Sequence, residues 1–368
     1  MTEKQNIQRE PLVRLAKRDD LSGAKKWAIR LVAIVLALVV GSLFIAVLGH
    51  NPIAVYHDII TGSLGGPSTA KVTVRVAIPL LGAALAIAPA FKMKFWNIGA
   101  EGQIMVGGIA ATYFALYWYD TLPKPALLIV MAVASILAGG IWGLVPAFCK
   151  ARWGTNETLF TLMLNYIAMQ LASYFIIIWE VPKGAGKIGI INQASEAGWL
   201  PRIGGQAQLL PILVVALLTG MMYVYLTYSK HGYEIAVVGE SQRTASYAGI
   251  KVDRVIIRTM VLSGAICGLM GYILTAGISH TLTTTIVDSR GFTAVMVSWM
   301  SKFNPFIMIA ASLLLVTMDR GASEVSSSLG LNHSFADILT GFILFFIIAT
   351  EFFITYKVTL RKSSKKEA

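Results

Sequence analysis

The chain has 368 residues, of which 56% are hydrophobic and only 14% are charged, and its mean hydropathy is +0.67. Soluble globular domains carry about 25% charged residues, so this composition excludes a soluble fold and indicates an apolar surface that faces lipid. The net charge of +12 does not indicate a nucleic-acid partner, because the basic residues form short clusters between apolar runs, as the topology signals of membrane proteins do.

Apolar runs that can cross a bilayer as helices occur along most of the chain. A helix needs about 20 residues to cross roughly 30 Å of hydrocarbon. The runs of this length are 27–49, 72–91, 96–118, 126–148, 158–179, 208–228, 256–278 and 335–357. Two shorter runs, 291–301 and 304–318, are interrupted by Asn304 and Pro305 and predict half-spans or tilted helices. The sequence therefore predicts an all-α fold, a polytopic transmembrane helical bundle of about ten spans with broken or short helices.

The distribution of Lys and Arg predicts which segments face the cytoplasm. With the N-terminus inside and the spans alternating, the inner segments hold 23 basic residues and the outer segments hold the other 8. Because basic residues favour the cytoplasmic side, we expect both termini there, in a multi-pass protein of the cell membrane. The expected organisation is a cytoplasmic tail over 1–26, a transmembrane domain over 27–357 and a basic cytoplasmic tail over 358–368.

The segment FKMKFWNIGAEGQIMVGG, residues 91–108, is unusually polar for a span. Asn97, Glu101 and Gln103 lie close together among several glycines. A carboxylate at membrane depth costs roughly 3 kcal/mol on insertion scales, so such residues usually face a cavity or a partner group. One interpretation is a broken helix that lines a polar path through the membrane. The other is a helix that begins at the cytoplasmic interface, with Glu101 in its first turn where the helix dipole favours an acid.

The segment GTNETLFTLMLNYIA, residues 154–168, predicts the start of a helix. Thr155 or Asn156 can cap it, and Glu157 then lies in the first turn. Asn165 and Tyr166 follow well inside the span and supply hydrogen-bonding groups and an aromatic surface, as a pathway for a sugar or nucleoside would require. The competing interpretation of Asn165 is a hydrogen bond between helices.

The inner segment 229–255 contains the sequence GESQRTASYAGI at 239–250. Ser241 can cap a short helix there, with Ala245, Ala248 and Gly249 on a smooth face and with Glu240 and Arg243 polar. Such a helix would fit a groove on another protein. The alternative is an ordinary surface loop.

The segment from His280 to Pro305 combines a polar outer part with a short apolar run. Thr283, Thr284 and Thr285, followed by Asp288 and Arg290, predict an outer cap or a re-entrant turn. In the apolar run, Phe292 and Trp299 are candidates for stacking on a flat ring, although aromatic residues at helical spacing also serve as packing residues.

The sequence offers no pattern for catalysis or metal binding. Cys149 and Cys267 lie inside apolar runs without metal-ligand spacing, and the five histidines are scattered. We therefore expect no catalytic residue, no metal site and no cofactor bound by this chain.

Several of these segments carry a family resemblance. They are NIGAEGQ at 97–103, TNETLFTLMLNYIA at 155–168, VVGESQRTASYAGI at 237–250, MVLSGAICGLMGYILTAG at 260–277 and GFTAVMVSWMSKFNPFIMIAASLL at 291–314. Together they resemble the permease subunits of bacterial ABC importers of the branched-chain amino acid, ribose and nucleoside type, over roughly residues 50–355. NIGAEGQ is most similar to the simple-sugar and nucleoside branch.

The resemblance implies a function and a set of partners. It implies an ATP-driven importer in which segment 229–255 is the coupling loop, with Gly239, Glu240, Arg243, Ala245, Ala248, Gly249 and Ile250 docking on a separate ATP-binding subunit that binds ATP and Mg²⁺. It also implies a second permease subunit, often a homologue, and an external binding lipoprotein that delivers a nucleoside or simple sugar to segments 50–71 and 180–207. The chain itself lacks the phosphate-binding pattern G-x-x-x-x-G-K-S/T, since GAGK at 184–187 has different spacing.

Two other functions are weighed against the importer. A secondary carrier driven by an ion gradient would need acidic or histidine relays at membrane depth, where Glu101 is the plausible candidate. A membrane-embedded enzyme would need a nucleophile with a base or a metal cluster, and the sequence shows neither.

Overall fold

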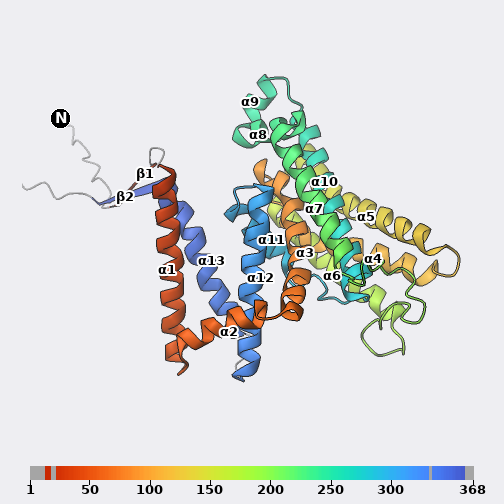
Figure 1. Cartoon of the computed structure of the whole chain (residues 1–368). Helices are drawn as coiled ribbons and strands as arrows, with labels where there is room; N and C mark the ends of the chain where they lie inside the picture. The colour runs from red at the N-terminus through yellow and green to blue at the C-terminus, as the bar shows by residue number, and fades with distance from the viewer. Residues whose placement is uncertain (1–12, 18–21, 331–333, 361–368) are drawn as a thin grey trace, which may run out of the picture. The chain divides into compact units, whose positions relative to one another are not determined.

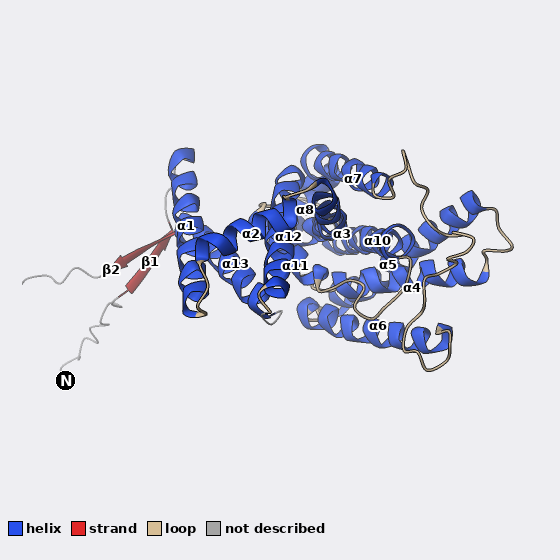
Figure 2. Cartoon of the chain, turned by 60° about the horizontal axis from the view of Figure 1, so that its bottom comes forward, coloured by secondary structure: helices blue, strands red, loops and turns tan. Residues whose placement is uncertain are grey.

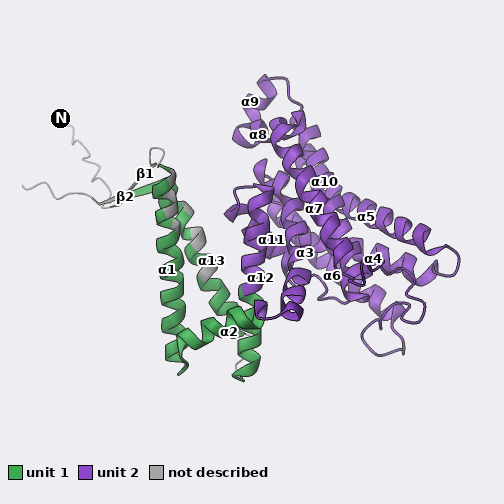
Figure 3. Cartoon of the chain, viewed as in Figure 1, with its two compact units in different colours: residues 1–62, 318–368 green, residues 63–317 purple. Residues whose placement is uncertain are grey.

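The computed structural model describes residues 13–17, 22–330 and 334–360, and most of them lie in helices (Figure 2). The chain divides into two compact units, residues 1–62 with 318–368 and residues 63–317, which are described separately (Figure 3). We call them unit 1 and unit 2.

Unit 1 contains the two ends of the chain. Its elements are β1 (Val13–Lys17), α1 (Gly23–Val47), most of α2 (Pro52–Leu64), the last part of α12 (Pro305–Ser328), α13 (Ser334–Thr355) and β2 (Tyr356–Leu360). The α1 and α13 helices pack together, with the rings of Phe44 and Phe335 stacked at 5.9 Å. Strands β1 and β2 pair antiparallel, so residues 13–17 of the expected N-terminal tail form a strand beside the C-terminal segment. Residues 23–26 of the expected N-terminal tail begin α1, residues 358–360 of the expected C-terminal tail belong to β2, and residues 1–12, 18–21 and 361–368 lie outside the described residues.

Unit 2 contains the other helices. They are α3 (Pro67–Lys92), α4 (Ala100–Tyr117), α5 (Lys124–Trp153), α6 (Glu157–Trp179), α7 (Leu209–Tyr228), α8 (Lys230–Glu240), α9 (Gln242–Tyr247), α10 (Val252–Tyr272), the π-helix η1 (Ile273–Ser279), α11 (Arg290–Met300) and the first part of α12. In Figure 1, α8 and α9 lie at one end of this unit and the loop between α6 and α7 lies at the opposite end.

Small residues let α4, α5 and α10 approach one another closely in the core of unit 2. A Cβ atom added to Gly107, Gly139 or Gly268 would come within 3.0 Å of the backbone of the facing helix. The hydroxyl of Ser135 on α5 donates to the carbonyl of Gly107 on α4 at 2.9 Å. Close backbone contact and interhelical hydrogen bonds replace the hydrophobic effect as the cause of helix association within lipid.

The all-α prediction is confirmed, and about ten spans is somewhat more than the described residues show. Within the described residues, 6 helices are long and apolar enough to cross a membrane, or 7 if the pair Leu31–Val47 and Pro52–Leu64, bent by 110°, is one span. The α4 helix is not among them, since Glu101 and Gln103 occupy its first turns. The α11 helix has 11 residues and spans only about 16 Å.

The helix that forms over the run 304–318 is longer than expected. The apolar stretch ends near Met318, but the helix α12 continues to Ser328 and has 24 residues. Polar residues do not end a helix unless they also break its backbone geometry, so hydropathy underestimated its length.

Candidate functional site

The connection between α3 and α4 is irregular, and Asn97 within it is fully buried. The side-chain amide of Asn97 donates to the hydroxyl of Ser263 on α10 at 3.0 Å. Its oxygen accepts from the backbone N–H of Gly99 at 3.0 Å and from the amide of Gln103 at 3.3 Å. Asn97 and Gln103 thus satisfy groups within the protein at the point where the helix begins. Ser263, which sequence reasoning missed, lies in an apolar run and gives no local signal.

The start of α4 is also held by Asn165 on α6. The side-chain oxygen of Asn165 accepts from the backbone N–H of Gly102 at 2.8 Å, and its nitrogen donates to the carbonyl of Ile98 at 2.8 Å. These bonds pair two backbone groups that the interrupted helix leaves unsatisfied. The geometry therefore favours the interpretation of Asn165 as a link between helices. The neighbouring Tyr166 is 63% exposed and points to a different face.

Glu101 joins the first turn of α4 to the start of α11. One carboxylate oxygen accepts from the backbone N–H of Ser289 at 3.1 Å, and the other accepts from that of Gly291 at 2.8 Å. Only 2% of Glu101 is exposed. Because the N-terminus of a helix carries unsatisfied N–H groups and partial positive charge, a carboxylate there is a strong cap. Glu101 thereby fixes the turn that precedes α11.

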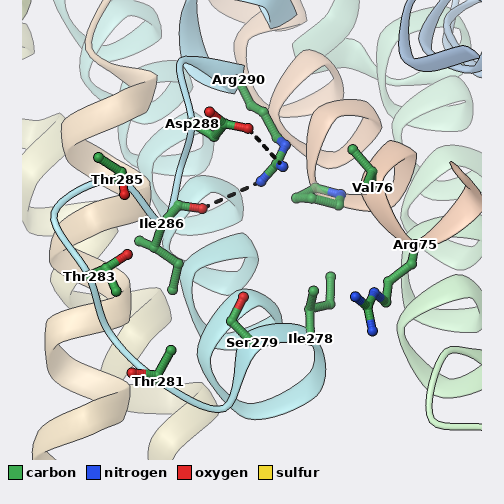
Figure 4. A pocket seen from close by; sticks show the side chains of 11 residues that line it. Arg75, Val76, Ile278, Ser279, Thr281, Thr283, Thr285, Ile286, Asp288 and Arg290 are labelled. Carbon is green, nitrogen blue, oxygen red and sulfur yellow. Dashed lines mark hydrogen bonds and ion pairs between the residues drawn. The ribbon is translucent and has the colours of Figure 1, made fainter. Parts of the chain in front are cut away.

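That turn forms one wall of a pocket of about 400 Å³, which we call the outer pocket (Figure 4). It is lined by residues of α3, of η1 and of the turn before α11, namely Arg75, Val76, Pro79, Ile278, Ser279, Thr281, Thr283, Thr285, Ile286, Asp288 and Arg290. The guanidinium of Arg290 donates to the carboxylate of Asp288 at 3.3 Å and to the carbonyl of Ile286 at 3.4 Å. The polar part of the 280–305 segment was expected to form an outer turn, whereas the approach of Arg75 to it was not foreseen.

Two aromatic residues singled out in the sequence lie on α11. Phe292 is partly exposed and Trp299 is 44% exposed, on the same side as the exposed Met296. The ring of Trp299 stacks on that of Trp96, with centroids 5.6 Å apart and an interplanar angle of 26°. Trp96, which sequence reasoning missed, belongs to the irregular connection before α4, so the stack is a second contact between this connection and α11.

The loop 180–207 packs on the end of η1. The rings of Trp199 and His280 stack at 3.9 Å, and the backbone N–H of Ile191 donates to the carbonyl of His280 at 2.8 Å. The hydroxyl of Thr281 donates to the carbonyl of Ile188 at 2.8 Å. Burial lowers the pKa of His280, and the positive charges of Arg202 and Arg75 lower it further, which favours the neutral imidazole. The loop is therefore attached to the segment that lines the outer pocket.

At the opposite end of unit 2, α9 forms as the sequence predicts. The hydroxyl of Ser241 accepts from the backbone N–H of Thr244 at 3.2 Å and caps the helix. The expected smooth face differs, however, because Ala245 is buried among Ile235, Val238 and other apolar side chains. A partner therefore cannot contact Ala245 in this conformation.

Of the other residues of the expected docking set, some are exposed and others are buried. Glu240, Arg243, Ala248 and Gly249 are exposed, Ile250 is partly buried and Gly239 is buried. A Cβ atom on Gly239 would collide with the carbonyl of Lys92 at the end of α3. Gly239 thus allows close contact between two helices. Tyr247, which was not in the expected set, is 93% exposed.

Comparison with known proteins identifies the family. The family model described as branched-chain amino acid transport system / permease component matches residues 70–348. A glucose ABC transporter permease protein of Haloferax volcanii is 29% identical over 88% of this chain and 88% of its own length. A nucleoside ABC transporter permease protein of Lactococcus lactis is 27% identical over 93% of this chain and 95% of its own length.

Two further relatives come from a single organism, Bacillus subtilis. One guanosine ABC transporter permease protein is 30% identical over 87% of this chain and 92% of its own length. A second is 24% identical over 66% of this chain and 77% of its own length. The chain therefore belongs to the branched-chain amino acid transport system permease family, in the branch that contains the nucleoside and simple-sugar ABC transporter permeases.

Proposed function

We propose that this chain is a membrane-spanning subunit of an ATP-driven importer, which forms the pathway for a nucleoside or simple sugar delivered by an external binding lipoprotein. The names of the relatives support this cargo class, since they include permeases for glucose, guanosine and nucleosides. Hydrolysis of ATP, with its Mg²⁺, occurs in a separate ATP-binding subunit. The protein lies in the cell membrane with both termini in the cytoplasm, which the distribution of Lys and Arg supports.

The observation that carries the proposal is the construction of α8 and α9. Ser241 caps α9, and the buried Ala245 anchors it in an apolar cluster. The guanidinium of Arg258 on α10 donates to the carboxylate of Glu234 on α8 at 2.9 Å. These contacts fix the position of α9, which carries the exposed Arg243 and Tyr247. Such a helix can transmit a displacement of the ATP-binding subunit to α3 and α10, because packed interfaces shift as units between discrete arrangements.

A second permease subunit completes the pathway. We assign the partly exposed side of α11, with Phe292, Met296 and Trp299, to this pathway or to the contact with the second subunit. A subunit contact would cover these large apolar groups, whereas in the pathway their aromatic rings could stack on a flat ring of the cargo. The two guanosine permease proteins of one bacterium favour a homologous partner over an identical one. The loop 180–207 receives the binding protein.

The alternative, a secondary carrier driven by an ion gradient, is less well supported by the geometry. Its carboxylate would have to bind and release an ion at membrane depth. Both oxygens of Glu101 instead accept backbone N–H groups of the α11 turn. Release of those groups would leave two buried donors unpaired, at about 1–3 kcal/mol each.

Reconstitution of the complete complex tests the proposal. The chain is incorporated into proteoliposomes with its ATP-binding subunit and second permease subunit, and uptake of radiolabelled guanosine and glucose is measured with the loaded binding protein outside. We expect uptake of one of them only with ATP present on the side of the ATP-binding subunit. Uptake that continues without ATP in a proton or sodium gradient would establish the carrier instead.

A further inference from the structure

We propose that the outer pocket binds the hydroxyl-bearing ring of the cargo, through vicinal hydroxyl groups, after the binding protein releases it. This inference rests on the proposed function and assigns a particular site to it. The pocket volume of about 400 Å³ lies within the roughly 300–1,000 Å³ typical of small-molecule sites.

The lining of the outer pocket has the composition that a polyhydroxylated ring requires. The hydroxyl groups of Ser279, Thr283 and Thr285 can donate and accept hydrogen bonds, the hydroxyl of Thr281 can still accept while it donates to Ile188, and Val76 offers apolar surface. Each hydroxyl of a vicinal diol is likewise both a donor and an acceptor. A site that mixes donors, acceptors and apolar patches therefore matches a sugar ring better than it matches a purely apolar solute.

Arg75 gives the strongest indication of a ligand. It extends toward the cavity from α3 (Figure 4). Its Nε atom is buried and has no hydrogen-bond partner within the part of the chain that the structure describes. A buried donor without a partner is unfavourable, and a bound oxygen acceptor would satisfy it.

The acceptor side of the site is the carboxylate of Asp288. Its side chain is 73% exposed and is oriented by the guanidinium of Arg290. One carboxylate can accept from both hydroxyls of a vicinal diol, as it has about four lone-pair sites. Arg75 and Asp288 thus place a donor and an acceptor in the lining of one pocket, from elements far apart in the sequence.

The same geometry disfavours a phosphate ligand. The N-terminus of α11 borders the pocket and would ordinarily attract an anion. Its backbone N–H groups at Ser289 and Gly291 already donate to Glu101, and the carboxylate of Asp288 would repel a phosphate. The charge of Arg290 is compensated by Asp288, so a phosphate would be attracted chiefly by Arg75, and competition by phosphate is part of the test.

Ligand binding to the complete complex tests this site directly. The importer complex is placed in lipid nanodiscs without binding protein, and saturation-transfer NMR measures the affinities of adenosine, 2′,3′-dideoxyadenosine and glucose. We expect adenosine or glucose to bind. If adenosine binds, the dideoxy compound should bind at least about tenfold more weakly, because it lacks both hydroxyl groups of the diol. Inorganic phosphate should not displace the bound probe.

Variants of the chain connect the binding to the outer pocket. Arg75→Leu should weaken binding of the bound probe about tenfold, and Thr283→Val should weaken it severalfold. Thr219→Val serves as the matched control, because Thr219 lies on α7 and donates to the carbonyl of Val215 within its own helix. It should leave the affinity unchanged.

Several results would overturn the inference. They are absence of binding by both adenosine and glucose, equal binding of adenosine and its dideoxy analogue, wild-type affinity in Arg75→Leu, and displacement by phosphate. ATP-dependent uptake in proteoliposomes distinguishes an error in the assignment of the pocket from an error in the proposed function. Uptake by the wild-type complex would persist if only the pocket assignment is wrong, and would be absent if the chain is not an importer subunit.

Discussion

Replacement of Glu101 by Gln tests the contact between α4 and the turn before α11. The carboxylate accepts two backbone N–H groups, and hydrogen bonds to a charged group contribute about 1.5–3 kcal/mol each. Glutamine retains one acceptor oxygen, but its amide group faces the second N–H as a donor. We therefore expect the free energy of local opening to fall by about 2–4 kcal/mol.

Hydrogen exchange read by mass spectrometry measures this opening directly. Because 1.4 kcal/mol corresponds to a factor of ten, about 2–4 kcal/mol predicts amide protection at residues 286–293 lowered by roughly 30-fold to 1,000-fold in Glu101→Gln. The control is Asn156→Ala, which removes the cap of α6 and should affect only the amides near Leu159. Protection at 286–293 within about threefold of the wild-type value would show that Glu101 does not hold this turn.

Three other predictions follow from the contacts in unit 2. Asn165→Leu removes the side-chain partner of the backbone N–H of Gly102 and of the carbonyl of Ile98. We expect expression to continue, uptake to fall and hydrogen exchange at residues 98–102 to accelerate. Wild-type uptake would remove Asn165 from the pathway region. Ala245→Leu should overpack the buried cluster beneath α9 and lower the free energy of unfolding by about 1–3 kcal/mol. Ala248→Trp, at an exposed position, should leave thermal stability unchanged and uncouple ATP hydrolysis from uptake. Equal stability of the two variants would contradict the burial of Ala245. The hydrogen bond from Arg258 lowers the pKa of Glu234, so this interaction stabilises α8 fully above the unfolded pKa of about 4.3 and is lost as pH falls through the lower folded pKa. Proteolysis of residues 230–247 should therefore accelerate below about pH 4 in the wild type. The Glu234→Gln variant should show little of this pH dependence.

Local features of the fold could be read from the sequence because they depend on neighbouring residues. The cap at Asn156 serves the backbone N–H of Leu159, and that at Ser241 serves the N–H of Thr244, each three residues away. The membrane-spanning character followed from composition, since apolar runs of about 20 residues are stable as helices in lipid. The polar turn before α11 was predicted from its own residues, Thr283–Thr285, Asp288 and Arg290.

The tertiary structure decided which side chains meet. Glu101 and Gly291 are separated by 190 positions, and their contact depends on the packing of α4 beside α11. Packing also determined that Ala245 is buried, although its neighbours in the sequence are small and polar. The approach of Arg75 to the 278–290 segment created the outer pocket. Sequence patterns report the preference of each residue for helix, lipid or water, whereas these contacts depend on the angles and distances between helices, which no single segment encodes.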